Sequence, residues 1–156
     1  MANPNAETLR NLIHTFIRRF GLLDEARTPC GLPIAVSDAH ALMELLHNPG
    51  IEQVELAKRL GLSKSAVSRL LLRLENRGLV QRAISKEDRR AHDLRLSDKG
   101  ERMASRINRE SLARFETILS GLPDGKSASL LECLPHLIQA IPEQVQAEDK
   151  EGFLDE

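Results

Sequence analysis

One stretch, residues 56–97, constrains the fold of this chain more than any other. It reads LAKRLGLSKSAVSRLLLRLENRGLVQRAISKEDRRAHDLRLS. Gly61 separates two short helical patterns, and Ser63 has the side chain that commonly caps the start of a helix. Two short β-patterns, residues 79–84 and 92–96, flank a link that is too polar to be buried. The stretch therefore predicts a helix-turn-helix followed by a charged hairpin, which can place a helix in one groove of duplex DNA and a loop in the next.

The second helix of this motif, residues 64–76, has one apolar and one polar face. The apolar face consists of Ala66, Val67, Leu70, Leu71 and Leu74, and the outward face of Ser65, Ser68, Arg69, Leu72, Arg73 and Asn76. Short serines let the backbone approach DNA, and the N–H groups of a first helical turn can bind phosphate. We expect Arg69 to contact a base edge, and Lys64 and Arg73 to bind phosphates. The alternative is that these are ordinary surface charges, with Arg73 paired to Glu75 or Arg69 to a neighbouring acid.

Charge is segregated along the chain, although the formal net charge is only -1. Residues 58–102 contain thirteen Lys and Arg against six Asp and Glu, whereas residues 142–156 contain one against six. A compact basic region on a near-neutral protein is typical of a protein that binds polyanions. Aromatic residues make up only 3%, which argues against a platform for stacking single-stranded bases.

Further helices are expected on both sides of the motif, at residues 6–20, 38–47, 53–60, 98–120 and 126–141. We expect Ser37 to cap the second of these and Ser97 the fourth. We also expect Val54 to be buried in the third, Gly100 to be a weak point in the fourth, and Pro135 to kink the last. The first helix and the last two have apolar stripes that are wide for a single small domain, which suggests packing against a second copy.

The chain is thus predicted to be mainly α, a winged helix-turn-helix lobe with a small β-hairpin wing and a helical dimerisation region. We divide it into an N-terminal helix and connector (1–36), a DNA-binding lobe (37–97), C-terminal helices (98–141) and an acidic tail (142–156).

Residues 56–82 together with 84–100 resemble winged helix-turn-helix regulators of the multiple-antibiotic-resistance (MarR) family. The marks are Leu-Ala at 56–57, Arg-Gly-Leu-Val at 77–80, Asp-x-Arg at Asp88 and Arg90, and Leu-Ser-x-x-Gly at 96–100. The resemblance covers about residues 5–141. It implies an obligate homodimer built by the first, fifth and sixth helices, which usually represses transcription and leaves DNA when a small anion binds or a cysteine oxidises. Leu72, often polar in the family, and Glu52, where Ser or Thr usually caps, depart from the pattern.

The same resemblance makes Arg90 the minor-groove residue of the wing, where a guanidinium reads groove width and potential. Asp88 is expected to hold an arginine in place by a bidentate pair. The complete expected DNA-binding set is Lys64, Ser65, Ser68, Arg69, Arg73, Arg82, Lys86, Asp88, Arg89, Arg90 and Arg95. Two lobes on one dimer predict a pseudo-palindromic operator with half-sites roughly 10 bp apart.

Three signals could release DNA, and the sequence leaves all three open. A small organic anion could bind where the dimer helices meet the lobe, near His14, Arg18, His40 and His47. Cys30, close to Arg27 in a Thr-Pro-Cys-Gly loop, could be oxidised, whereas Cys133 is expected in the core. Zinc could be held by Asp24, Cys30 and His40, but residues 98–120 lack the His that some relatives use.

Other classes of function fit less well. The sequence has no nucleophile elbow, phosphate loop or metal-ligand spacing, so we expect neither an enzyme nor a cofactor. It has no apolar run near about 18 residues and no leader pattern, so we expect a cytoplasmic protein with no membrane partner. The alternative to a regulator is an architectural protein that binds duplex DNA without sequence preference.

Overall fold

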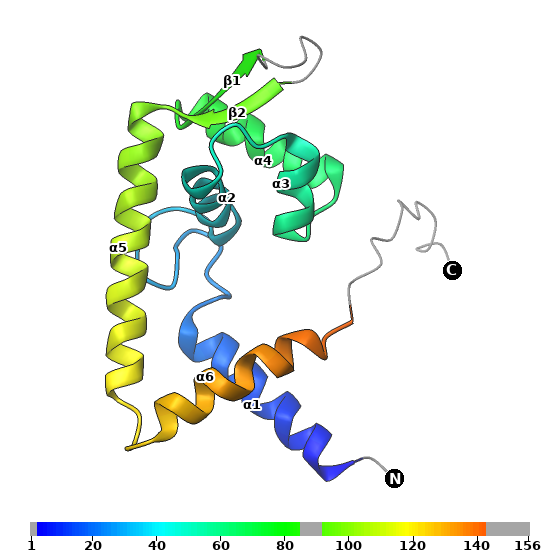
Figure 1. The fold of residues 1–156 in the computed structure, drawn as a ribbon, viewed down its shortest axis with the longest axis vertical. Coiled ribbons are helices and arrows are strands. Elements are labelled where there is room, and N and C mark those ends of the chain that lie inside the picture. The colour runs from blue at the N-terminus through cyan, green and yellow to red at the C-terminus, as the bar shows by residue number, and fades with distance from the viewer. Residues whose placement is uncertain (1–2, 85–91, 143–156) are drawn as a thin grey trace.

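The computed structural model describes residues 3–84 and 92–142, which form six helices and a two-stranded hairpin (Figure 1). The elements are α1 (Pro4–Phe20), α2 (Val36–His47), α3 (Gln53–Leu60), α4 (Lys64–Asn76), β1 (Val80–Ile84), β2 (His92–Leu96), α5 (Asp98–Ser120) and α6 (Lys126–Gln139). The predicted fold class, mainly α with a small β wing, is confirmed. Within the described residues, every helix is either too short or too polar to cross a membrane.

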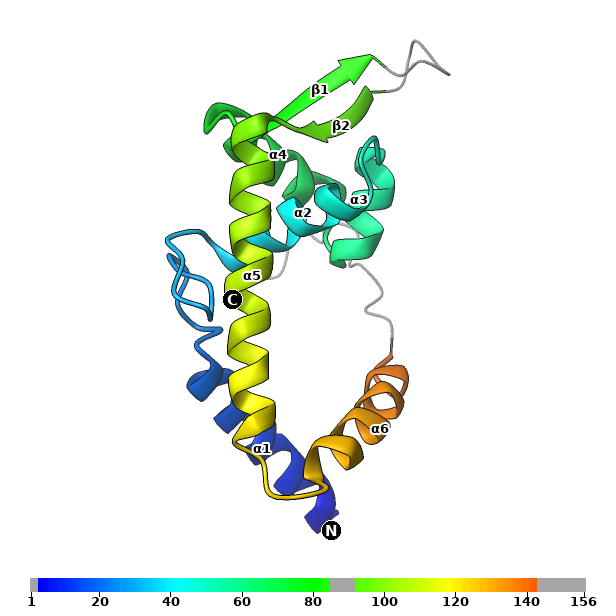
Figure 2. The same cartoon turned by 60° about the vertical axis from the view of Figure 1, so that its left-hand side comes forward.

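A single aliphatic core holds α2, α3, α4 and the hairpin together against the first half of α5. Its largest fully buried side chains are Ile34, Leu42, Leu45, Leu56, Val67, Leu70, Leu71, Leu74, Leu79 and Leu94. We call this unit, residues 32–84 and 92–107, the lobe; it is wider than the DNA-binding lobe predicted for residues 37–97. In both views α5 is a long rod that carries the lobe at one end and meets α1 and α6 at the other (Figures 1 and 2).

The hairpin is fixed to the lobe at its base. β1 and β2 are antiparallel, with Val80 opposite Leu96 and Arg82 opposite Leu94. Leu94 also forms an isolated β-bridge with Ile51, which lies in the segment that leads into α3. Since Val80, Ile51 and Leu94 are all buried, the hairpin grows out of the core and points its far end away from it.

Three of the helices begin at side-chain caps. Ser63 accepts a hydrogen bond from the N–H of Ala66, Ser97 from the N–H of Gly100, and Asn3 from the N–H of Asn5. The first two caps were expected, whereas Asn3 starts α1 two residues earlier than the apolar stripe indicates.

The prediction that Ser37 caps α2 is wrong. This helix begins at Val36, and Ala35 precedes it without a side-chain hydrogen bond. Its first turn is held instead by a tertiary contact, because Asp38 is buried against Arg73 of α4 and Arg77 at the cap of that helix.

Gly100 is a structural requirement rather than the weak point expected in α5. A Cβ at this position would lie 2.0 Å from the carbonyl oxygen of Leu79 and 3.3 Å from the Cβ of Leu96. Only glycine therefore lets the start of α5 approach the chain where it enters β1.

The flanking helices differ from the lobe in leaving their apolar side chains exposed. Neither α1 nor α6 has a buried residue, and in α5 burial stops at Ile107. The exposed set includes Leu9, Leu12, Ile13, Phe16, Leu112, Phe115, Ile118, Leu130, Leu131, Leu134 and Ile138. Cys133, expected in the core, is exposed on α6. Val54, expected to be buried in α3, is 52% exposed, because the other face of this short helix packs on α4.

Candidate nucleic-acid interface

The outward face of α4 is exposed to solvent, as its sequence pattern predicts. Lys64, Ser65, Ser68, Arg69 and Arg73 are all exposed, while the opposite face lies in the core. Among the residues that the structure describes, neither Lys64 nor Arg69 has a hydrogen-bond or ion-pair partner. Both cations can therefore bind a ligand without first losing such a contact in the described chain.

The start of α4 is ordered by its own serines. The Ser63 hydroxyl accepts the N–H of Ala66 at 3.2 Å and lies 3.1 Å from the hydroxyl of Ser65. The cap fixes the direction of the helix axis, and the positive end of the helix dipole is then at the exposed N-terminus. A phosphate is the kind of group that such an end binds.

A chain of polar contacts ties the middle of α4 to α3 and to the hairpin. Gln53 donates from Nε2 to the Ser68 hydroxyl at 2.7 Å and accepts at Oε1 from Arg82 at 3.3 Å. Arg82 also donates from Nε to Glu75 at 2.6 Å. Glu75 thus pairs with the hairpin and not with Arg73, the alternative that the sequence left open. We call Gln53, Ser68, Glu75 and Arg82 the polar belt.

Arg73 is paired with a residue of a different helix. Its Nη2 donates to Oδ1 of Asp38 at 2.7 Å, and Nη1 of Arg77 lies 3.8 Å from Oδ2 of the same carboxylate. Asp38 is buried, whereas both arginines are about half exposed. No sequence pattern predicts this pair, since 35 positions separate Asp38 from Arg73.

The remaining expected contacts divide between one described residue and four others. Arg95 is exposed on β2, and its Nη2 lies 3.4 Å from the carboxylate of Asp93. Lys86, Asp88, Arg89 and Arg90 lie outside the described residues, so the roles assigned to them stay predictions.

The described ion pairs on this side of the lobe differ in how easily they can change partner. Arg82–Glu75 and Arg95–Asp93 are partly exposed, and such pairs typically contribute about 0–1 kcal/mol. Their arginines can turn to phosphate at little cost. The Asp38 carboxylate is 4% exposed, and a buried charge that loses its partner is strongly destabilising.

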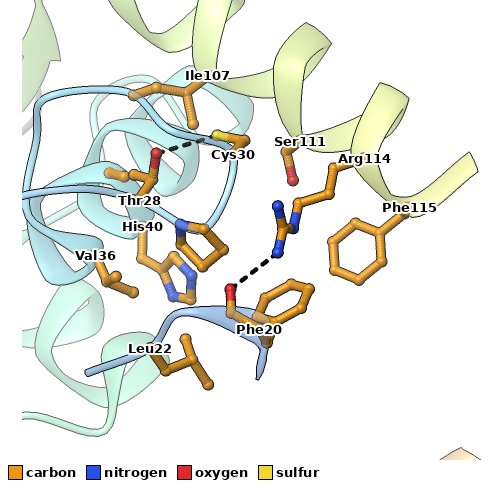
Figure 3. A pocket seen from close by; sticks show the side chains of 12 residues that line it. Phe20, Leu22, Thr28, Cys30, Val36, His40, Ile107, Ser111, Arg114 and Phe115 are labelled. Atoms are coloured by element: carbon orange, nitrogen blue, oxygen red, sulfur yellow. Dashed lines mark hydrogen bonds between the residues drawn. The ribbon is translucent and has the colours of Figure 1, made fainter. Parts of the chain in front are cut away.

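A pocket of about 230 Å³ lies between the end of α1, the connector, α2 and α5 (Figure 3). It is lined mostly by apolar groups, among them Phe20, Leu22, Val36, Ile107 and Phe115. Arg114 enters it from α5, donates to the carbonyl oxygen of Phe20 at 3.1 Å and stacks 5.0 Å from the Phe20 ring centroid. The buried Nε of Arg114 has no hydrogen-bond partner among the described residues.

The residues expected at an effector site are only partly brought together by this pocket. His40 and Cys30 line it, and the Cys30 sulfur lies 3.1 Å from the hydroxyl of Thr28. His14, Arg18 and His47 do not line it; His47 instead contacts the carbonyl oxygen of Met43 at 2.8 Å. Arg114 was missed, although an arginine inside the apolar stripe between Leu112 and Phe115 is a signal that could have identified it.

A metal site is not formed by the described part of the chain. No group of three or more His, Cys, Asp or Glu residues there lies close enough to hold an ion. Asp24, Cys30 and His40 therefore do not assemble into the zinc site considered from the sequence.

Comparison with known proteins places the lobe among known regulators. Residues 31–91 match the model of the MarR family. The chain is 34% identical over 97 residues to the transcriptional regulator HosA of Escherichia coli O157:H7, an alignment that covers 62% of this chain and 72% of HosA.

Solved structures extend the likeness to most of the chain. The transcriptional repressor CouR, bound to a 23-mer DNA duplex, is 28% identical with a TM-score of 0.64, and the match covers 85% of this chain and 89% of CouR. FabT of Streptococcus pneumoniae, in complex with DNA, is 24% identical with a TM-score of 0.68, over 86% and 92% of the two chains. At such low identity the FabT match shows a shared fold.

Proposed function

Because the chain belongs to the MarR family of transcriptional regulators, we propose that it is a dimeric repressor that binds a specific duplex operator through α4 and the hairpin. The observation that carries this proposal is the exposed face of α4, where Lys64 and Arg69 are free of described partners beside a hairpin bearing Arg82 and Arg95. Its relatives are regulators, and an enzymatic activity is not part of the proposal.

Each exposed group on α4 has a distinct role in this proposal. Arg69 reads a base edge, since a guanidinium can donate two hydrogen bonds to guanine. Lys64 and the helix N-terminus bind phosphates, and Ser65 and Ser68 keep the surface low enough for close approach. In the wing, Arg90 enters the minor groove and Asp88 orients an arginine, while Lys86 and Arg89 contact the backbone.

Dimerisation is supported by the unburied apolar side chains of α1, of α6 and of α5 beyond Ile107. These three segments lie at the end of the molecule opposite the hairpin (Figures 1 and 2), so their exposed side chains can contribute to one interface with a second copy. Apolar area of this extent is the usual mark of an interface. Two lobes related by a two-fold axis then require a pseudo-palindromic operator.

The pocket supports release of DNA by a small organic anion, and the residues that line it would then be the sensor. Its apolar lining suits a ring or a short chain, and Arg114 offers a buried N–H that has no described partner. A carboxylate pairs well with a guanidinium in such surroundings. Oxidation of Cys30 is the second candidate, because the thiol lines the same pocket.

Operator binding can be tested by selecting bound genomic fragments and footprinting them. A regulator protects one discrete pseudo-palindromic site, whereas an architectural protein coats the fragment uniformly. Arg69→Ala should weaken operator binding about 5- to 150-fold, the loss of about 1–3 kcal/mol that a base contact provides. The matched control is Arg106→Ala, which removes an exposed arginine from the outer face of α5 and should change affinity less than twofold.

The wing assignment has its own test. Arg90→Ala should weaken operator binding several-fold or more while the protein stays dimeric in sedimentation experiments. An unchanged mobility-shift affinity at physiological salt would contradict the minor-groove role of Arg90.

The two release mechanisms can be separated on the selected operator. A panel of aromatic and aliphatic carboxylates should release wild-type protein, and Arg114→Met should abolish that release while keeping the length of the side chain. Cys30→Ser should respond to carboxylates as wild type does. If instead peroxide releases DNA and Cys30→Ser alone is resistant, the cysteine is the sensor and the anion proposal is wrong.

A further inference from the structure

Asp38 is a buried carboxylate that the proposed function does not use. It lies in the first turn of α2, is almost fully buried, and pairs with Arg73 of α4 and with Arg77 at the C-terminal cap of that helix. One oxygen takes Arg73 at 2.7 Å, and the other lies 3.8 Å from Arg77. The α2 and α4 helices are thereby joined by a charge pair on the surface of the core.

The spacing of the arginines shows what this contact does to the DNA-facing surface. Arg69 and Arg73 belong to α4, and Arg77 is the residue at its C-terminal cap. The three follow one another at four-residue intervals, so they lie along one side of this helix. Arg69 has no partner among the described residues, whereas the other two converge on Asp38. One buried carboxylate therefore leaves the Arg69 guanidinium available for DNA and pairs with the other two.

We propose that Asp38 is a specificity-determining positioning residue, which keeps Arg73 and Arg77 away from the phosphates and fixes the orientation of α4. The inference rests on the proposed operator binding. It gives Arg73 a different role from the phosphate contact that the sequence alone predicts. Lysines and arginines that bind phosphate raise affinity for every duplex alike, whereas base contacts need a helix held at a defined angle. By pairing two cations, Asp38 lowers the affinity for duplexes of any sequence and holds α4 at the angle that its base contacts need.

This pair is suited to such a role because it cannot easily exchange. An exposed pair such as Arg59–Glu55 on α3 is readily replaced by water or phosphate. Asp38 has little access to solvent, so losing its arginines would leave a buried charge without compensation. The arginines are consequently held even when a phosphate competes for them.

The test is Asp38→Asn, which keeps the size of the side chain and removes its charge. Affinity is measured by fluorescence anisotropy for the selected operator and for a scrambled duplex of equal length, between about 50 and 200 mM salt. Two released arginines per subunit should make the slope of log affinity against log salt steeper by about 2 to 4 in the dimer. Affinity for the scrambled duplex should rise about tenfold at the lowest salt, and the operator-to-scrambled ratio should fall at least fivefold.

A purely structural role for Asp38 predicts something different. In that case Asp38→Asn lowers affinity for both duplexes and leaves the salt slope as it is, which would overturn the proposal. The matched control is Glu55→Gln, which removes the half-exposed carboxylate of an arginine pair within α3 and should leave the slope and the ratio unchanged.

A second variant keeps the proposal testable if Asp38→Asn does not fold. Arg73→Gln should lower the operator-to-scrambled ratio with no change in the salt slope, since this arginine is held away from phosphate. Lys64→Gln should flatten the slope. If Arg73→Gln flattens it equally, Arg73 binds phosphate in the wild type and the proposal is wrong. If the wild type binds the operator and the scrambled duplex equally well, the proposed sequence-specific operator binding is itself wrong.

Discussion

The lobe and the flanking helices are built from the same kind of apolar stripe, yet only the lobe buries it within one chain. Leu42, Leu71 and Leu74 are 0% exposed in the lobe, whereas Leu12 on α1 is 62% exposed and Leu131 on α6 is 59% exposed. The lobe thus covers its apolar residues within one chain, whereas the flanking helices leave theirs exposed. This difference is what the proposed function requires, with operator binding by the lobe and dimerisation through the flanking helices.

The largest effect should come from placing a charge on the flanking surface. Leu12→Glu puts a carboxylate where the proposed interface would bury it in both subunits, and an unpaired buried charge costs several kcal/mol. We expect the dimer dissociation constant to rise at least about 100-fold, since each 1.4 kcal/mol is tenfold. Sedimentation equilibrium measures the dimer dissociation constant directly, while the far-UV circular dichroism spectrum of the protein should change little.

Leu72→Glu is the control for that experiment. Leu72 is 56% exposed, close to the value for Leu12, but it lies on α4. Its substitution should leave the dimer intact and affect DNA binding alone. Equal loss of the dimer in both variants, or in neither, would remove the distinction between the two regions.

The next largest effect concerns the joint between the lobe and α5. Gly100→Ala forces a Cβ to within 2.0 Å of the Leu79 carbonyl oxygen, so the start of α5 must move. Overpacking of this kind typically costs about 1–3 kcal/mol, even though alanine favours a helix more than glycine does. Denaturant unfolding should show this loss at every protein concentration, because the joint lies inside one chain.

Gly121→Ala is the matched control at the other end of α5. A Cβ there would meet its nearest neighbour, the Thr117 carbonyl oxygen, at 3.5 Å, an ordinary contact. Its free energy of unfolding should stay within about 0.5 kcal/mol of wild type. Equal stability of both alanine variants would show that α5 does not need its close approach to Leu79.

What the sequence could predict follows from how local each feature is. The caps at Ser63 and Ser97 and the two faces of α4 depend on neighbours within a few residues, and they are confirmed. The hairpin pairs two strands that follow one another along the chain, and it is confirmed as well. The placement of Arg114 in the pocket and the Asp38–Arg73 pair depend on contacts across 94 and 35 positions, which no spacing rule reports. Periodicity likewise predicted an apolar face on α6 without saying whether the same chain covers it.

The smallest effect compares one helix cap from each region. Ser63→Ala removes the hydroxyl that accepts the N–H of Ala66 at the start of α4, and Asn3→Ala removes the equivalent acceptor at the start of α1. Loss of a cap typically costs about 1 kcal/mol. Because α4 is part of the lobe core, Ser63→Ala should lower the free energy of unfolding by about this amount. Asn3 is exposed at the outer end of a helix with no buried residue, so Asn3→Ala should cost only a few tenths, as fraying of one turn does. Urea unfolding of both variants at matched concentration measures the difference, and a larger loss for Asn3→Ala would mean that α1 contributes to stability as much as the lobe does.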